Sequence, residues 1–203
     1  MKEQQVSFQA DDARLEGFWY KANGEKGAVI CHPHPQYGGT MHNNVVKAAS
    51  KTFNAVGYST LRFNFRGVEN STGQYGDGIA ERYDVAAAFS FVRDQGMKEV
   101  VIAGYSFGGW VAAHTVLDLS AAGLLLISPP IAMFDIDFRN LALPLWVICG
   151  ELDEYCPLGE LKNRLQGVST LKGTRWVEGA DHFYWGHEES IQSAIKLWFD
   201  QTE

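Results

Sequence analysis

Short apolar runs alternate with amphipathic segments along most of this chain, and this alternation restricts the fold more than any other feature of the sequence. Each apolar run has the length and composition of a buried strand, and each amphipathic segment has the apolar spacing of a helix. Strands that alternate with helices in this way predict a mainly parallel sheet with helices on both faces. The expected fold class is therefore α/β.

The expected elements follow one another with short connections, as is usual for this class. We expect strands at residues 6–9, 15–20, 28–31, 59–63, 99–103, 124–127, 145–149 and 174–177. We expect helices at residues 43–56, 80–94, 110–119, 158–165 and 188–199. The first two strands are predicted to form a hairpin about Asp11 and Asp12, which adds an antiparallel edge to the sheet.

The chain length limits the number of domains. With 203 residues, 46% of them hydrophobic, the chain has enough apolar side chains for one well-buried core. No proline- or serine-rich linker divides it, so we expect residues 1–203 to form a single domain. Right-handed crossovers place the loops that follow the parallel strands at one rim of the sheet, and the sites of open α/β sheets lie there.

Composition and charge exclude several classes of partner. The net charge is -7 and no basic cluster is present, which argues against nucleic acid. No apolar run approaches the roughly 20 residues of a membrane span, and the first residues lack the apolar segment of a signal peptide. The three cysteines, Cys31, Cys149 and Cys156, follow no disulfide pattern, and the first two are expected to be buried thiols. We therefore expect a cytoplasmic protein with no membrane partner, and nothing in the sequence indicates an oligomer.

The segment Gly104-Tyr105-Ser106-Phe107-Gly108 is the strongest indication of chemistry in the sequence. It lies between the strand expected at 99–103 and the helix expected at 110–119. A sharp turn from strand to helix exposes a serine hydroxyl at the rim of a parallel sheet. The flanking glycines let the two elements approach each other and tolerate a strained serine backbone. We therefore predict that Ser106 is a nucleophile; the alternative is a glycine-rich turn with a structural role.

A serine nucleophile needs a base that takes its proton and an acid that orients the base. Asp153 follows the strand expected at 145–149, and His182 follows the strand expected at 174–177, so both are predicted to lie on rim loops. We predict that Asp153 is the acid and that His182 is the base. Glu151, on the same loop as Asp153, is the alternative acid.

The tetrahedral intermediate of acyl transfer also needs hydrogen-bond donors for its oxyanion. One expected donor is the backbone N–H of Phe107, at a helix N-terminus, where the dipole favours negative charge. The second should come from the loop after the strand at 28–31, in which two prolines lack an N–H. His34 is the favoured donor, and Gln36 is the alternative.

Two groups of side chains near the rim have competing interpretations. A metal site could be formed by His32, His34 and His42. The His-x-His spacing is only half of a metal-binding motif, however, and no second set of ligands follows at a fixed spacing, so we predict neither a metal nor a cofactor. The favoured role of His32 is that of a buried, hydrogen-bonded residue that shapes the loop. Arg66 could bind an anionic substrate group, but its favoured role is to tie rim loops together.

At these positions the chain resembles the α/β-hydrolase superfamily, and within it the small lid-less hydrolases related to dienelactone hydrolases and bacterial esterases. The resemblance covers nearly the whole chain and rests on residues 32–35, 38–41, 43, 64–68, 104–108, 150–153 and 179–183. It implies an α/β-hydrolase fold, a triad of Ser106, Asp153 and His182, and an oxyanion hole at Phe107 and the His34 region. The chain differs from dienelactone hydrolases in having a serine in place of their cysteine nucleophile. Residues 128–143 are also too few for a full cap domain, so a minimal cap or none is expected.

We therefore expect a serine hydrolase that cleaves carboxylic esters or related small acyl compounds through an acyl-Ser106 intermediate. A peptidase or thioesterase with the same three residues is the alternative among enzymes, because all three share the acyl chemistry. A non-catalytic binding protein that retains the fold is the alternative of another class.

Overall fold

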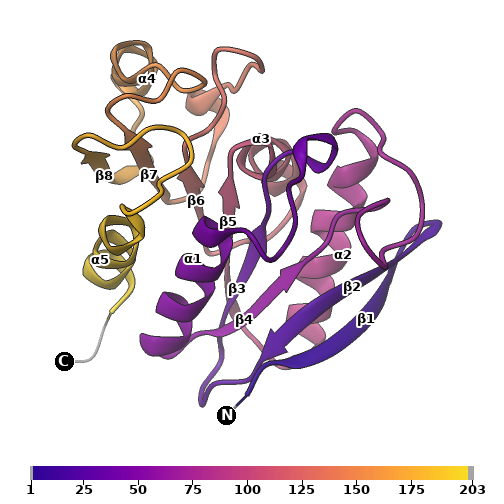
Figure 1. Ribbon diagram of the computed structural model, residues 1–203. Helices are drawn as coiled ribbons and strands as arrows, with labels where there is room; N and C mark the ends of the chain where they lie inside the picture. The colour runs from indigo at the N-terminus through magenta and orange to yellow at the C-terminus, as the bar shows by residue number, and fades with distance from the viewer. Residues whose placement is uncertain (1, 201–203) are drawn as a thin grey trace.

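The computed structural model describes residues 2–200 of the chain (Figure 1). An eight-stranded sheet runs through the molecule in the order β1-β2-β4-β3-β5-β6-β7-β8. β1 pairs antiparallel with β2, β2 pairs antiparallel with β4, and the strands from β4 to β8 along the sheet are parallel. The strands are β1 Gln4–Ala10, β2 Ala13–Tyr20, β3 Lys26–Cys31, β4 Ser59–Phe63, β5 Glu99–Tyr105, β6 Gly123–Ile127, β7 Leu145–Gly150 and β8 Leu171–Val177.

Helices cover both faces of the sheet. The helices are α1 Asn44–Ala55, α2 Ala80–Asp94, α3 Phe107–Thr115, α4 Leu158–Leu165 and α5 Glu188–Phe199, with short 3-10 turns η1 Pro35–Tyr37, η2 Val116–Asp118 and η3 Phe138–Asn140. α1 and α5 pack side by side on one face, and α2, α3 and α4 pack on the other (Figure 1). The expected class, a mainly parallel α/β sheet with an antiparallel N-terminal strand, is confirmed.

The central strands are apolar because both of their faces are covered. All five residues of β6 are buried, and successive side chains point to opposite faces. Leu124 and Leu126 join the core under α2 and α3, whereas Leu125 and Ile127 join the core under α1 and α5. A strand with two buried faces has a continuous apolar sequence, and the sequence of β6 is apolar throughout.

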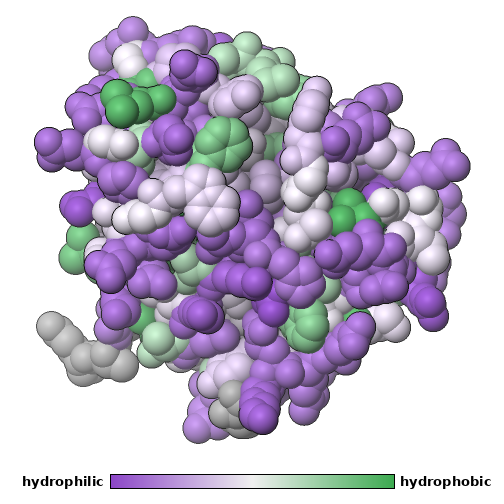
Figure 2. All heavy atoms as spheres, viewed as in Figure 1, coloured by the Kyte–Doolittle hydropathy of each residue, from purple (hydrophilic) through white to green (hydrophobic). Residues whose placement is uncertain are grey.

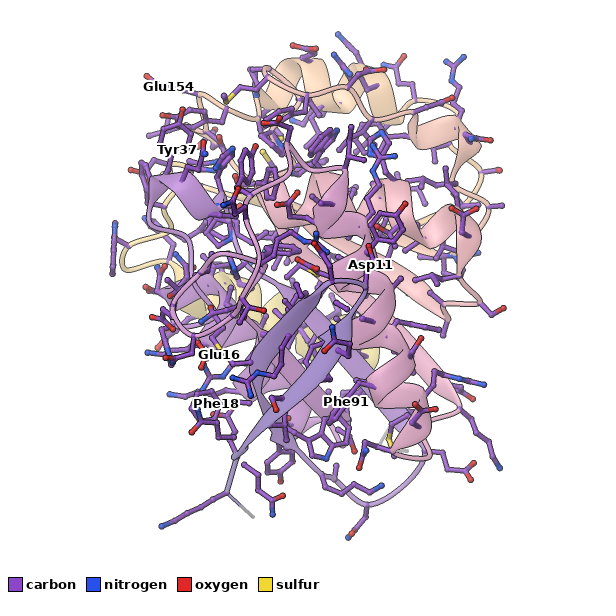
Figure 3. The ribbon with its side chains drawn as sticks, turned by 90° about the vertical axis from the view of Figure 1, so that its right-hand side faces the viewer. Asp11, Glu16, Phe18, Tyr37, Phe91 and Glu154 are labelled. Carbon is purple, nitrogen blue, oxygen red and sulfur yellow. The ribbon has the colours of Figure 1, made fainter. Side chains whose placement is uncertain are left out.

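The N-terminal hairpin turns where the sequence predicts. Ala10 pairs with Ala13, and Asp11 adopts a φ of 49° in the two-residue turn (Figure 3). β1 is longer than expected, and its inner face packs on α2: the rings of Phe8 and Phe91 lie 5.2 Å apart between centroids. The hairpin thus closes one end of the core.

Two expected boundaries near Ser106 are corrected by the structure. β5 extends to Tyr105, and α3 begins at Phe107 rather than at residue 110 and ends at Thr115. Gly108 and Gly109 therefore lie inside the helix, although glycine alone disfavours a helix interior. Residues 128–144, where the chain returns from β6 to β7, contain one short 3-10 helix, η3, and form no cap.

Cys31, Cys149 and Cys156 are buried and unpaired, and burial raises the pKa of the Cys31 thiol well above its usual value. No helix within residues 2–200 combines the length and the apolar character that crossing a membrane requires.

Candidate active site

Ser106 occupies the sharp turn between β5 and α3. Its backbone has φ 53° and ψ −125°, a conformation that costs a non-glycine residue about 1–3 kcal/mol. The Ser106 N–H donates to the carbonyl of Ile127 at 2.9 Å, and the Ser106 carbonyl accepts from the N–H of Gly109 at 2.8 Å. Bonds to the neighbouring strand and to the first turn of the helix therefore hold the strained residue in place.

The glycines on either side of Ser106 are required by close backbone contacts. A Cβ atom on Gly104 would lie 2.5 Å from the carbonyl oxygen of Gly108, and one on Gly108 would lie 2.4 Å from that of His32. A separation this short overlaps the van der Waals radii, so α3 can pack directly on β3 and β5 only where side chains are missing. This explains why a glycine, Gly108, lies in the first turn of α3, directly after Phe107.

The structure brings Ser106, Asp153 and His182 together from the loops that follow β5, β7 and β8. His182 Nε2 lies 2.9 Å from Ser106 Oγ, and His182 Nδ1 lies 2.9 Å from each carboxylate oxygen of Asp153. The three residues are only 7%, 3% and 7% exposed in chain order. A carboxylate that accepts a hydrogen bond from Nδ1–H leaves Nε2 unprotonated and able to accept the serine proton.

Asp153, rather than the alternative Glu151, is the carboxylate that contacts His182. Asp153 Oδ1 also accepts the backbone N–H groups of Tyr155 and Cys156, each at 2.9 Å, which fixes the carboxylate and stabilises its charge. The Glu151 side chain is exposed and accepts from the N–H of Gly179 at 3.3 Å. The geometry therefore favours Asp153 as the partner of the imidazole.

Two buried tyrosines that the sequence analysis did not assign hold the loop of His182. The Tyr105 hydroxyl donates to the backbone carbonyl of His182 at 2.6 Å, and burial raises the pKa of Tyr105, which keeps this hydroxyl protonated. The Tyr184 hydroxyl lies 2.7 Å from Ser128 Oγ at the end of β6. A buried tyrosine needs a partner for its hydroxyl. A tyrosine at the end of the apolar run of β5 is therefore the sequence feature that could have indicated this contact.

The side chains of His34, in the loop after β3, and of Phe107, the first residue of α3, lie in contact. The rings of His34 and Phe107 are 4.6 Å apart between centroids. The N–H of Gln36 donates to His34 Nδ1 at 3.2 Å, and that of Tyr37 donates to the His34 carbonyl at 3.1 Å. Pro35 has no N–H, and within residues 2–200 the backbone N–H groups of His34 and Phe107 have no acceptor. Of residues 34–37, His34 alone keeps a free backbone N–H.

The three imidazoles considered for a metal have separate partners. His32 Nδ1 donates to the carbonyl of Pro33 at 2.6 Å, and His32 Nε2 accepts from the N–H of Phe65 at 3.0 Å. Burial lowers the pKa of His32 to about 3, so the ring is neutral near pH 7. His42 lies 3.6 Å from Glu69. In the part of the chain that the structure describes, no group of three or more His, Cys, Asp or Glu side chains is arranged to hold a metal ion.

Arg66 is a structural cation. Its guanidinium donates twice to Asp84 Oδ1, at 2.8 and 3.0 Å, and once to Asp12 at 3.2 Å. Arg66 and Asp84 are both buried, and Asp12 lies in the hairpin turn. The guanidinium thus ties the loop after β4 to α2 and to the hairpin. These contacts agree with the favoured structural role of Arg66 rather than with the binding of an anionic substrate group.

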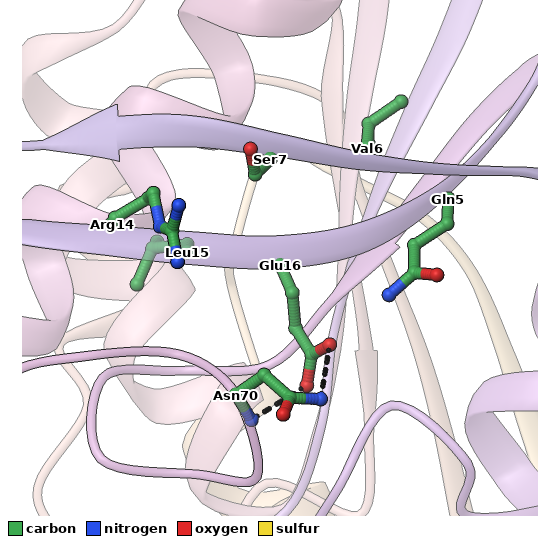
Figure 4. A pocket seen from close by; sticks show the side chains of 7 residues that line it. All are labelled: Gln5, Val6, Ser7, Arg14, Leu15, Glu16 and Asn70. Atoms are coloured by element: carbon green, nitrogen blue, oxygen red, sulfur yellow. Dashed lines mark hydrogen bonds between the residues drawn. The ribbon is translucent and has the colours of Figure 1, made fainter.

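A cavity of about 330 Å³ lies beside the N-terminal hairpin (Figure 4). It is lined by Gln5, Val6, Ser7, Arg14, Leu15, Glu16 and Asn70. The carboxylate of Glu16 accepts two hydrogen bonds from Asn70, at 2.9 and 3.0 Å, so these two residues of the lining are engaged with each other. β1 and β2 are separated from β5 by β4 and β3, so this cavity is distinct from the candidate active site.

The chain is similar to known proteins over nearly its whole length. A protein from Rickettsia prowazekii that has not been characterised is 32% identical over 205 residues, which span 94% of this chain and 86% of the relative. The structure of an alpha-beta serine hydrolase homologue from Coxiella burnetii is 30% identical, with a TM-score of 0.88 over 96% of each chain. The structure of an α/β serine hydrolase without a lid from Xanthomonas campestris is 25% identical, with a TM-score of 0.88 over 100% of this chain and 98% of that one. Residues 28–201 match the family model of the alpha/beta hydrolase domain, and the chain belongs to the alpha/beta hydrolase family.

Proposed function

We propose that this protein is a serine hydrolase that cleaves carboxylic esters or related small acyl compounds through an acyl-Ser106 intermediate. The observation that carries the proposal is the continuous hydrogen-bonded chain from Asp153 through His182 to Ser106. The strained backbone of Ser106 supports it, because strain of this kind concentrates at functional residues. Membership of a family of hydrolases supports it as well.

The positions of these side chains suggest one role for each in the two half-reactions. In the first, His182 Nε2 takes the proton of Ser106 as Oγ attacks the acyl carbonyl, and His182 then gives that proton to the leaving group. The free N–H groups of His34 and Phe107 would receive the oxyanion. Asp153 holds the imidazole in the required tautomer. In the second half-reaction, His182 activates a water that releases the acyl group.

Turnover of p-nitrophenyl acetate tests the proposal. Ser106→Ala should lower kcat by at least about 10³-fold, while circular dichroism and the melting temperature stay close to those of the unmodified protein. Ser120→Ala, at an exposed serine outside the site, is the matched control and should keep full activity. Retained turnover in Ser106→Ala would overturn the assignment. Faster turnover of acetanilide or of an acetyl thioester than of the oxygen ester would make the protein an amidase or a thioesterase instead.

A further inference from the structure

Two half-exposed aromatic rings lie against the imidazole of His182. The ring of Tyr155 is 4.7 Å from it and the ring of Phe183 is 5.7 Å from it, between centroids. Tyr155 is 41% exposed and Phe183 is 51% exposed, whereas His182 itself is 7% exposed. The two rings come from the loops after β7 and β8, so together they form the solvent-facing border of the imidazole.

Both rings are carried by anchored backbone. The Tyr155 N–H donates to Asp153 Oδ1 at 2.9 Å, and the Tyr155 carbonyl accepts from the N–H of Ala132 at 3.1 Å. The Phe183 N–H donates to Asp181 at 2.9 Å, and the Phe183 carbonyl accepts from the side chain of Asn44 at 3.0 Å. These bonds hold the backbone that carries each ring in place at the border.

The rim around the candidate site is rich in exposed apolar residues. Figure 2 shows green and pale side chains among the purple over the loop that joins β8 to α5. Tyr37, on the loop after β3, lies toward the same end of the molecule as Glu154 of the β7 loop (Figure 3). Large exposed apolar residues on the rim loops are Tyr37, Met133, Leu152, Tyr155, Phe183 and Trp185. Single exposed apolar residues are ordinary, but a border of them around a reactive group favours an apolar ligand.

The proton transfer of acylation fixes which part of a substrate meets this border. His182 Nε2 must come within roughly 2.6–3.2 Å of the leaving-group oxygen to protonate it. The remainder of the leaving group therefore lies next to the imidazole, where Tyr155 and Phe183 present exposed aromatic rings. Aromatic groups gain additional stabilisation from offset or edge-to-face contacts with such rings.

We propose that Tyr155 and Phe183 form a subsite for the leaving group and select esters whose alcohol carries an aromatic ring. The inference rests on the proposed function, because it assigns the leaving group to the side of His182. The step needs no further reactant: the bond from Oγ to the acyl carbon forms, the ester C–O bond breaks, and the serine proton passes through His182 to the released alcohol.

The test compares kcat/KM for benzyl acetate and methyl acetate. Both esters give the same acetyl-Ser106, so the ratio of the two kcat/KM values reports the alcohol part alone. The unmodified protein should prefer benzyl acetate, and Tyr155→Ala combined with Phe183→Ala should lower this ratio by roughly tenfold. Tyr155→Phe keeps the ring and should keep the ratio. Leu197→Ala, at an apolar residue that is 77% exposed near the end of α5, is the matched control.

Three results are decisive. A selective loss with benzyl acetate supports the subsite. An unchanged ratio overturns it, whether both kcat/KM values are retained or both fall equally; an equal fall would mean that the rings only support the imidazole. Labelling by a fluorophosphonate distinguishes failure of the subsite from failure of the proposed function. An unchanged ratio in a protein that is labelled at Ser106 refutes the subsite alone. A protein that is not labelled and hydrolyses neither ester refutes the proposed function.

Discussion

Acid should destabilise this protein through His32 in particular. His32 is fully buried as a neutral ring, with Nδ1 donating to Pro33 and Nε2 accepting from Phe65. Protonation of Nε2 would put a second N–H against the Phe65 N–H. Burial accordingly lowers the pKa of His32 from 6.5 to about 3. The residue matters for the site because its carbonyl faces Gly108 and its loop leads to His34.

The sign and size of the effect follow from this shift. Because the pKa is lowered in the folded state, the unfolded chain binds the proton more readily, and the stabilisation is fully present above pH 6.5. It is lost as the pH falls from 6.5 toward about 3, at about 1.4 kcal/mol for each pH unit. At pH 5 the loss from His32 should therefore be about 2 kcal/mol.

Urea unfolding at pH 7 and pH 5 measures this loss. His32→Gln removes the titrating group and leaves the other acidic and basic residues in place, so the pH-dependent terms that both proteins share cancel in the comparison. Between pH 7 and pH 5 the unmodified protein should lose about 2 kcal/mol more than His32→Gln. Equal losses in the two proteins would refute the reasoning, because they would show that His32 is not held neutral by its burial.

Four further substitutions test the site. Asp153→Asn should lower kcat by about 10⁴-fold, and Glu151→Gln should change it by less than about threefold because Glu151 is an exposed residue; the reverse order in steady-state assays would transfer the role of acid to Glu151. Gly104→Ala places a methyl group 2.5 Å from the carbonyl oxygen of Gly108 and should cost about 3 kcal/mol in urea unfolding; a midpoint equal to that of the unmodified protein would contradict this contact. Tyr105→Phe removes the hydroxyl that holds the carbonyl of His182 and should cost about 1 kcal/mol. It should also lower kcat more than it raises KM, and an unchanged kcat would show that this bond does not position the imidazole.

The parts of the fold that depend on local pattern could be predicted from the sequence. β6 is a continuous apolar run because both of its faces are buried, and such a run is visible without a structure. Ser106, Asp153 and His182 lie on the loops that follow β5, β7 and β8, and the ends of parallel strands meet at one rim. Their proximity therefore followed from the order of elements, and the fold class was confirmed.

The parts that depend on contacts between distant segments could not be predicted. The sequence predicts the start of α3 three residues too late, because Gly108 disfavours a helix by itself, while its close contact with the His32 carbonyl requires glycine there. The partner of the Tyr105 hydroxyl lies 77 residues away, at the carbonyl of His182. Neither contact has a local signature, since each is made only when the strands are assembled.

Covalent labelling with a fluorophosphonate tests the central claim most directly, because the probe reacts with an activated serine whatever the natural substrate is. The account predicts that the intact protein gains one label, that peptide mapping places it on Ser106, and that His182→Ala abolishes or greatly slows the reaction. A folded protein that takes up no label, or that is labelled at another residue, would contradict the claim that Ser106 is a nucleophile activated by His182.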